Sequence, residues 1–331
     1  MMRVRAALAM LAATTASLLT MSACGGSQPR APSGSERLEP RWQDVFDRVP
    51  DVFVVVRPRT LRQDRMYGPL LAHAVAAARA NNRVVAATRA LDAVEDADEV
   101  LVGVDAGSSE GRDLVVVTRG VRADLDPGKL SDGEGRALWE PGPSAAVREL
   151  VCERDAHGTD VGASLFELPG RTWVIASGEA RERARDVFAH PVNRPIPELD
   201  RDALAIVRLD GPSLVQHTRQ LQGTGALSAA GHHLQWAAAA LTPGEQGVRA
   251  TLSYADDDSA GLAEISVREA LLALGRSKSE RFAWLGKATV ERSDRRVVIH
   301  APLPPELVEA FVRAAGTRPP GEASPPAKPA Q

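Results

Sequence analysis

The strongest constraint on the fold is a series of short β-rich runs that are joined in pairs by polar turns. Residues 99–105 (EVLVGVD) and 113–119 (DLVVVTR) flank one such turn, and residues 161–168 and 171–177 flank Pro169-Gly170. Short runs rich in Val, Ile, Thr and aromatic residues are typical of strands, and Pro-Gly is a strong turn signal. Strands joined by so few residues pair antiparallel. The pattern therefore predicts antiparallel sheet over much of the chain.

A second series of elements begins at residue 202 and follows the order of the first. The run 202–208 (DALAIVR) matches 51–57 (DVFVVVR) in the spacing of its flanking Asp and Arg. Each half is predicted to run strand, helix, strand, strand, helix, strand, strand, helix. Helices interspersed among antiparallel strands indicate an α+β fold. We expect two similar subdomains, each a mainly antiparallel sheet with helices packed on one face.

Periodicity and end signals place the individual elements. Strands are expected at 51–57, 99–105, 113–119, 161–168, 171–177, 202–208, 234–241, 248–255, 285–293 and 295–303. Helices are expected at 58–80, where Pro69 interrupts the helical stretch, and at 144–150, 179–190, 211–222, 259–275 and 304–316. The helix at 259–275 is strongly amphipathic and ends at a glycine, as helices commonly do.

Proline-rich stretches mark the boundaries of the predicted domains. A junction at 191–201 separates subdomain 1 (41–190) from subdomain 2 (202–315). Residues 316–331 hold five prolines and are expected to form a disordered tail.

The first 23 residues predict a secretory signal peptide. Arg3 and Arg5 form a basic start, and an apolar run without charge extends from Ala6 to Met21. This run is shorter than the roughly 20 residues that span a bilayer. An ordinary cleaved signal with an incidental cysteine at position 24 is one interpretation.

The residues before that cysteine favour a lipid anchor. Met21-Ser22-Ala23-Cys24 resembles the lipobox of bacterial lipoprotein precursors, with Met21 where that family usually has Leu. The resemblance implies cleavage before Cys24, lipidation of its thiol, and attachment to the membrane through the acyl chains. Gly and not Asp follows Cys24, which by the same resemblance favours the outer membrane, with the body in the periplasm. Residues 24–40 are rich in Gly, Ser and Pro and are expected to form a flexible tether.

Charge and cysteine content narrow the class of protein further. Loss of the signal peptide leaves 308 residues with a formal charge of −5, which does not suggest a nucleic-acid partner. No later stretch is apolar and long enough for a second membrane span. With Cys24 acylated, Cys152 has no intramolecular partner, so we expect the fold to depend on its core and not on disulfides.

Ser109 lies in Gly107-Ser108-Ser109-Glu110-Gly111, which satisfies the G-x-S-x-G pattern of serine hydrolases. A nucleophile elbow requires strand, tight turn and then helix, but a β-rich run follows Gly111. The corresponding turn of the second half, 242–247 (TPGEQG), carries no serine. We therefore interpret the string as the tip of a hairpin.

Other chemical candidates are weak for reasons of spacing. Cys152 and His157 lie close enough in sequence for a thiol–imidazole pair, but Cys152 lies in or beside a short apolar run and His157 falls in a turn. His232-His233 lacks the further ligands that a metal needs. Asp256-Asp257-Asp258 does not have the alternating ligands of a calcium loop and precedes a helix, where acidic residues are favourable. Gly223-Thr224-Gly225 lacks the third glycine of a dinucleotide site. We expect no catalytic residue, no cofactor and no metal, and Cys24 is the one site residue assigned.

Tryptophans offer a last candidate for binding. Trp173, Trp236 and Trp284 fall in or beside predicted strands and are expected in the core. Trp139 lies in an irregular loop, where it is either an exposed interaction anchor or a residue that pins the loop to the core.

The sequence thus favours a lipid-anchored envelope protein that acts as a non-enzymatic binding or assembly module, with another envelope protein as a candidate partner. Its body is similar to uncharacterised lipoproteins of GC-rich proteobacteria. Two alternatives stay open: a receptor with a small-ligand site between the two halves, and a hydrolase with a site built from loops. A binding module should expose an apolar patch, whereas an enzyme should have a cleft with convergent titratable side chains.

Overall fold

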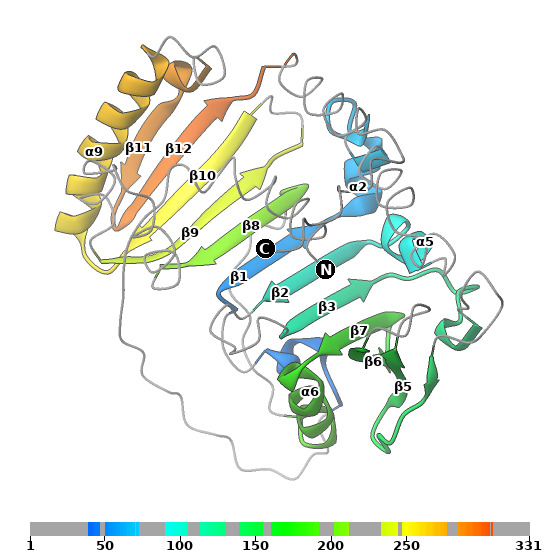
Figure 1. Cartoon of the computed structure of the whole chain (residues 1–331). Helices are drawn as coiled ribbons and strands as arrows, with labels where there is room; N and C mark the ends of the chain where they lie inside the picture. Colours follow the sequence, from blue (N-terminus) through cyan, green and yellow to red (C-terminus); the bar gives the residue numbers. More distant parts are fainter. Residues whose placement is uncertain are drawn as a thin grey trace, which may run out of the picture.

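The computed structural model describes residues 39–46, 50–69, 71–72, 90–104, 113–129, 139–154, 160–191, 202–211, 233–243, 247–276, 284–304 and 306. Within these residues, twelve strands form one antiparallel sheet (Figure 1). The strand order across the sheet is β11-β12-β10-β9-β8-β1-β2-β3-β7-β6-β5-β4. The fold is therefore α+β, with a single large sheet and few helices in the described part.

The elements have the following bounds. The strands are β1 (Val52–Val56), β2 (Glu99–Val104), β3 (Leu114–Arg119), β4 (Glu140–Pro141), β5 (Arg148–Arg154), β6 (Asp160–Leu168), β7 (Thr172–Ser177), β8 (Ala205–Asp210), β9 (Leu234–Leu241), β10 (Gly247–Tyr254), β11 (Thr289–Ser293) and β12 (Arg296–Pro302). The α-helices are α2 (Pro58–Gln63), α5 (Ala90–Glu95), α6 (Glu179–Ala189) and α9 (Asp257–Gly275). Short 3-10 helices are η1 (Trp42–Val45), η2 (Pro127–Lys129) and η3 (Trp284–Lys287).

The two halves of the chain meet at the centre of the sheet, where β1 pairs antiparallel with β8. Val54 lies opposite Val207, and Val55 lies opposite Ile206. Outward from this pair, β1-β2-β3-β7-β6 runs to one side and β8-β9-β10-β12-β11 to the other. On each side, three successive strands are followed by a hairpin whose second strand pairs with the third strand. The first five strands outward thus follow the same order on both sides, and β5 and β4 extend the sheet beyond β6 on the first side.

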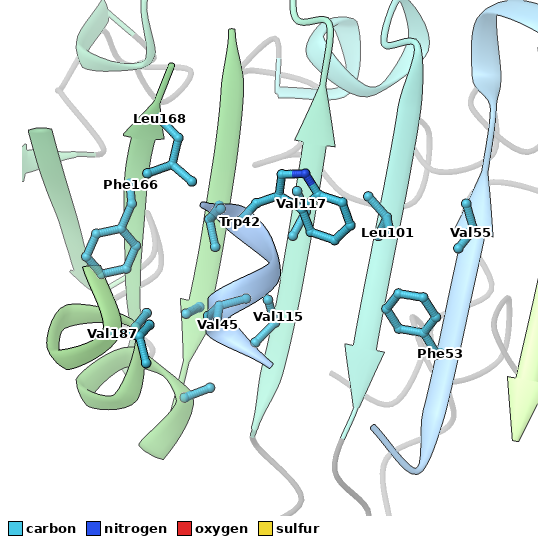
Figure 2. Close-up of a cluster of buried hydrophobic side chains, with 14 of the residues drawn as sticks. Trp42, Val45, Phe53, Val55, Leu101, Val115, Val117, Phe166, Leu168 and Val187 are labelled. Atoms are coloured by element: carbon cyan, nitrogen blue, oxygen red, sulfur yellow. The ribbon is translucent and has the colours of Figure 1, made fainter. Parts of the chain in front are cut away.

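One face of the sheet is covered by η1 and α6. Phe53, Val55 and Leu101 point to this face because alternate residues of a strand share a face. Trp42 and Val45 of η1 pack onto them and onto β3 (Figure 2). The burial of this cluster holds the N-terminal part of the described chain against the strands of the first half.

The opposite face, at the other end of the sheet, is covered by α9. Val54 lies between Phe53 and Val55 in β1 and joins a different cluster, which includes Val267 and Leu271 of α9. Neighbouring strand residues point to opposite faces, so α6 and α9 cover opposite faces of the sheet. Figure 1 shows α9 beside β11 and β12, far from α6, which lies beside β7.

The α+β prediction is confirmed, but the sheets of the two halves are joined into one. The sequence predicts separate sheets because its turn signals indicate only the pairing of strands that follow each other. The strands β1 and β8 pair although they are far apart in the chain. The described residues show one continuous sheet, and two similar subdomains are not established by it. The junction 191–201 lies outside the described residues apart from Pro191.

Most predicted strands are confirmed, and one predicted helix is wrong. The strand predicted at 234–241 has the bounds of β9, and α9 covers the helix predicted at 259–275. The sequence predicts a helix at 144–150, yet Arg148–Arg154 forms β5 and pairs with β6. In this strand the side chain of Glu149 accepts hydrogen bonds from Ser164 of β6 and from Arg185 of α6. The short helix α5 was not predicted.

Candidate functional site on the outer face of α9

Helix α9 begins with a well-formed cap. Asp256 has extended backbone angles, and its Oδ1 accepts a hydrogen bond from the backbone N–H of Ser259 at 2.7 Å. Its Oδ2 lies 2.8 Å from Nδ1 of His233. These hydrogen bonds, His233 first and then Ser259, lower the pKa of Asp256 to about 2. The acidic residues 256–258 therefore lie at the start of a helix, where their negative charges interact favourably with the positive end of the helix dipole.

The inner face of α9 is formed by small and medium side chains. Ala260, Ala263, Val267 and Leu271 are buried against β10, β11 and β12. At the end of the helix, a Cβ placed on Gly275 would come within 2.4 Å of the Cα of Gly286 in η3. The absence of side chains at both glycines lets the helix end pack directly on η3. These contacts hold α9 close to the sheet.

Ion pairs line one flank of α9. Arg292 of β11 places its Nη1 2.9 Å from Oδ1 of Asp257 and its Nε 3.5 Å from Oε2 of Glu264. Arg268 pairs with Glu264 at 2.8 Å and donates to the carbonyl oxygen of Val290 in β11. Pairs as exposed as these contribute little stability singly.

The outward side of α9 carries large apolar side chains. Leu262 is 63% exposed, Ile265 is 58% exposed and Leu272 is 53% exposed, and these are the exposed large hydrophobic residues of the described part. All three lie on one stripe, opposite the buried stripe of Ala260, Ala263, Val267 and Leu271. Single exposed apolar residues are ordinary, but several on one helix face indicate an interaction surface. We call this stripe the outer face of α9.

Two adjoining cavities lie beside η1 and β3, with volumes of about 380 and 340 Å³, and both are lined by Arg119 and Gly170. The carboxylate of Glu99 pairs with two of the arginines there: its Oε2 accepts from Nη1 of Arg119 at 2.7 Å and its Oε1 lies 3.4 Å from Nη2 of Arg57. The guanidinium of Arg119 also stands 5.6 Å from the ring centre of Trp42. Arg57 and Arg119 thus have partners within the protein, and Arg41 and Arg171 also line the cavities.

A buried ion pair lies under α6 and has a structural role. The side chain of Glu149 is fully buried, and its Oε1 accepts from Nε of Arg185 at 2.8 Å and from the hydroxyl of Ser164 at 2.6 Å. Its Oε2 accepts from the backbone N–H of Ser144 at 2.9 Å. Burial raises the pKa of Glu149, but the hydrogen bonds from Arg185, Ser164 and Ser144 outweigh burial and lower it. Glu149 is therefore a charged residue that ties α6 to β5.

Several residues singled out in the sequence lie outside the described residues: Cys24, Ser109, His157, His232 and Gly223–Gly225. The elements around Ser109 are described, and β2 and β3 pair antiparallel up to Val104 and Leu114. The next described element after Val104 is a strand and not a helix, which is the arrangement expected of two strands on either side of a hairpin tip.

The remaining candidates have partners in the fold. Cys152 is buried in β5, and Trp173 is buried in β7. Trp139 is partly buried and packs against a small cluster that includes Leu150 and Leu165, so it pins its loop to the sheet. Trp236 carries the guanidiniums of Arg208 and Arg296 over its ring, at 4.7 and 5.8 Å from the ring centre.

Among the residues that the structure describes, no group of three or more His, Cys, Asp or Glu side chains is placed to hold a metal ion. In the same residues, no helix has the length and apolar character needed to cross a membrane. The outer face of α9 is a feature that the sequence did not single out. The helical spacing of Leu262, Ile265 and Leu272 can be seen in the sequence. It was not singled out because a stripe buried in the core has the same spacing.

Comparisons with known proteins give a fold likeness and nothing more specific. No protein-family model matches the chain, and no curated protein matches it. Among solved structures, crystal form I of TP0453, a Treponema protein, is similar with a TM-score of 0.45 at 11% identity over 84% of this chain and 98% of that one. Crystal form III of TP0453 gives 0.46 at 10% identity over 82% and 97%. At this identity and TM-score, the likeness carries no argument about function.

Proposed function

We propose that the chain is a lipid-anchored envelope protein that acts as a non-enzymatic binding or assembly module through the outer face of α9. The observation that carries the proposal is the exposure of Leu262, Ile265 and Leu272 on one side of a helix whose other side is already packed. An exposed apolar stripe is the feature by which a binding module differs from an enzyme with a polar cleft.

The anchor is proposed from the sequence. Acylation of Cys24 would hold the protein at the outer membrane, and residues 24–38 would link the anchor to Glu39, the first described residue. A flexible chain of that length spans on the order of 20 Å on average and about 50 Å when fully extended. The body would therefore stay near the periplasmic side of the membrane while it remains free to turn toward a partner.

We also infer that the two halves of the chain are structural repeats. The support is the strand order, which runs β1-β2-β3-β7-β6 on one side of the central pair and β8-β9-β10-β12-β11 on the other. In this interpretation α9 occupies the place between the third strand and the hairpin. The first half fills that place with η2, β4 and β5. The outer face of α9 is then a feature of the second half alone within the described residues.

The proposed function is tested by photo-crosslinking in intact envelopes. A photoreactive amino acid replaces Ile265, and a control variant carries it at Lys129, which is highly exposed and lies in η2 in the other half of the chain. We expect a discrete protein adduct from position 265 and none from position 129. An adduct only with lipid, or no adduct at position 265, would overturn the proposal of a protein-binding surface.

A further inference from the structure

We propose that the partner of the outer face of α9 is the same helix of a second copy of this chain, packed antiparallel across a two-fold axis. This inference rests on the proposed function, which makes the outer face of α9 the contact surface. It adds the identity of the partner and the geometry of the pairing.

The first argument is the spacing of the exposed residues. Along the outer face, the exposed positions are Asp258, Leu262, Ile265, Glu269, Leu272 and Arg276. Successive members are separated alternately by four and three residues, which is the spacing of the seam by which one helix packs along another. A seam of this kind matches a second helix better than it matches a flat or irregular surface.

The second argument is charge. The seam starts with an acidic residue, Asp258, and ends with a basic one, Arg276. In an antiparallel pair centred at the level of Val267, Asp258 of one copy lies opposite Arg276 of the other, and this happens at both ends. A parallel pair would instead place Asp258 opposite Asp258 and Arg276 opposite Arg276. Like charges placed directly opposite are unfavourable, so the seam favours the antiparallel arrangement.

The two leucines of the seam obey the same symmetry, whereas Ile265 faces an acidic residue. With the axis at the level of Val267, Leu262 lies opposite Leu272 of the second copy, and Ile265 lies opposite Glu269. Each position of the seam has a counterpart at the same distance from Val267 on the other side. A two-fold interface requires this self-complementarity. The four leucines of the two copies would form two apolar contacts flanking the axis.

Glu269 distinguishes this partner from a lipid surface. Its side chain is exposed in the middle of the seam, between Ile265 and Leu272. If α9 entered the hydrocarbon of a bilayer through this face, the carboxylate would enter with it, at a large desolvation penalty. Between two helices the contact is narrow, so the long side chain of Glu269 can extend sideways from the seam and keep its carboxylate in water. A protein partner therefore fits the seam better than a membrane does.

The anchor strengthens a weak contact. One helix pair buries less surface than a typical stable dimer, for which about 800 Å² per partner is usual. Two copies attached to one membrane have a much higher effective concentration than two copies in solution. A two-fold axis along the membrane normal leaves both tethers on the same side, so anchoring and pairing are geometrically compatible.

The test is a charge exchange in the acylated full-length protein, measured by sedimentation velocity in detergent and by energy transfer between labelled copies in lipid vesicles. Asp258→Arg and Arg276→Asp each replace two attractive pairs with two repulsive ones. Each should weaken dimerisation about tenfold or more, given the usual strength of exposed ion pairs. The double variant D258R/R276D should dimerise again, and so should an equimolar mixture of the two single variants.

The recovery separates pairing from damage to the helix. Both substitutions place a charge unfavourably with respect to the helix dipole, so a purely structural effect would be greatest in the double variant. Glu140→Arg, at an exposed position in β4, is the matched control and should dimerise like the unchanged protein.

The outcomes also separate this inference from the proposed function. An unchanged protein that stays monomeric in vesicles, or single variants that dimerise normally, would overturn the two-fold pairing. If Ile265 still formed an adduct with another envelope protein, the binding module would stand with a different partner.

Discussion

The buried pair of Glu149 and Arg185 allows the most quantitative prediction. Arg185→Met removes the cation and keeps most of the side-chain volume, so a fully buried carboxylate is left with hydrogen bonds but without a countercharge. Breaking a buried pair in this way typically costs about 3–5 kcal/mol. Arg185 itself is 20% exposed, so water can reach part of the vacated space, and we expect a loss near the lower end, about 3 kcal/mol at pH 7.

The pH dependence of that loss tests the reasoning more sharply. In the unchanged protein the folded-state pKa of Glu149 lies below its ordinary 4.5, so its contribution is present above pH 4.5 and is lost as the pH falls through the lowered value. Without Arg185, burial becomes the main influence and should move the folded-state pKa above 4.5. The variant then gains stability relative to the unchanged protein on acidification. The difference at pH 7 should shrink toward about pH 4.

Equilibrium unfolding in urea, followed by far-UV circular dichroism at both pH values, measures the difference. Arg181→Met is the matched control, because Arg181 lies one turn earlier in α6 and pairs with Glu153, whose side chain is 61% exposed. Arg181 is itself only 17% exposed, but its removal leaves a carboxylate that water can solvate, so that variant should lose about 1 kcal/mol or less. Equal losses for the two variants, or a loss in Arg185→Met that does not change with pH, would refute the assignment of Glu149 as a buried charge.

Three further predictions concern α9 and the anchor. Gly275→Ala should destabilise the protein by about 1–3 kcal/mol, because the new Cβ would meet the backbone of Gly286. In Gly261→Ala the new Cβ would lie 3.6 Å from its nearest neighbour, Nη1 of Arg292, so this variant should be neutral or more stable by up to about 1 kcal/mol. Thermal unfolding of the two variants measures the difference. Asp256→Ala should lower the melting temperature at pH 7, and because the folded-state pKa of Asp256 is lowered from 3.8 to about 2, the difference should fade as the pH drops through that interval. Cys24→Ser should abolish labelling by radioactive palmitate and release the protein into the soluble fraction, and unchanged labelling would exclude lipidation at this residue.

Local sequence patterns predicted the strands well because each strand carries its own signal. β9 and the hairpin of β6 and β7 are bounded by turn residues, and their apolar residues must be buried in any fold of the chain. The helix predicted at 144–150 was wrong because that prediction also used a local signal, the helix propensity of Ala145 and Ala146. The strand β5 exists because β6, the next strand along the chain, pairs with it, and a reading of residues 144–150 alone does not include that partner. Tertiary pairing decides such segments.

The join between the halves was not predictable from these patterns. The repeated order of elements indicates which strands are equivalent, but it does not indicate which strand edges meet. The apolar run of β1 has no free edge in the structure, because β2 pairs on one side and β8 on the other. A central strand reads as a continuous apolar run whether its neighbours come from its own half or from the other. The sequence therefore predicts that β1 is buried and leaves its second neighbour open.

The outer face of α9 shows where helical periodicity is ambiguous and why that ambiguity points to a partner. The helix has two apolar stripes: Ala260, Ala263, Val267 and Leu271 on one side, and Leu262, Ile265 and Leu272 on the other. Burial of a Leu or Ile side chain is worth about 1.5–3 kcal/mol, more than burial of Ala, so a helix that served only its own fold should turn its larger residues inward. In α9 the small residues allow a close approach to the sheet, and the larger ones face outward, with charges of opposite sign at the two ends of the stripe. The exposed stripe therefore has apolar surface left to bury, and a second copy of the same helix, reversed in direction, supplies both the apolar contacts and the opposite charges.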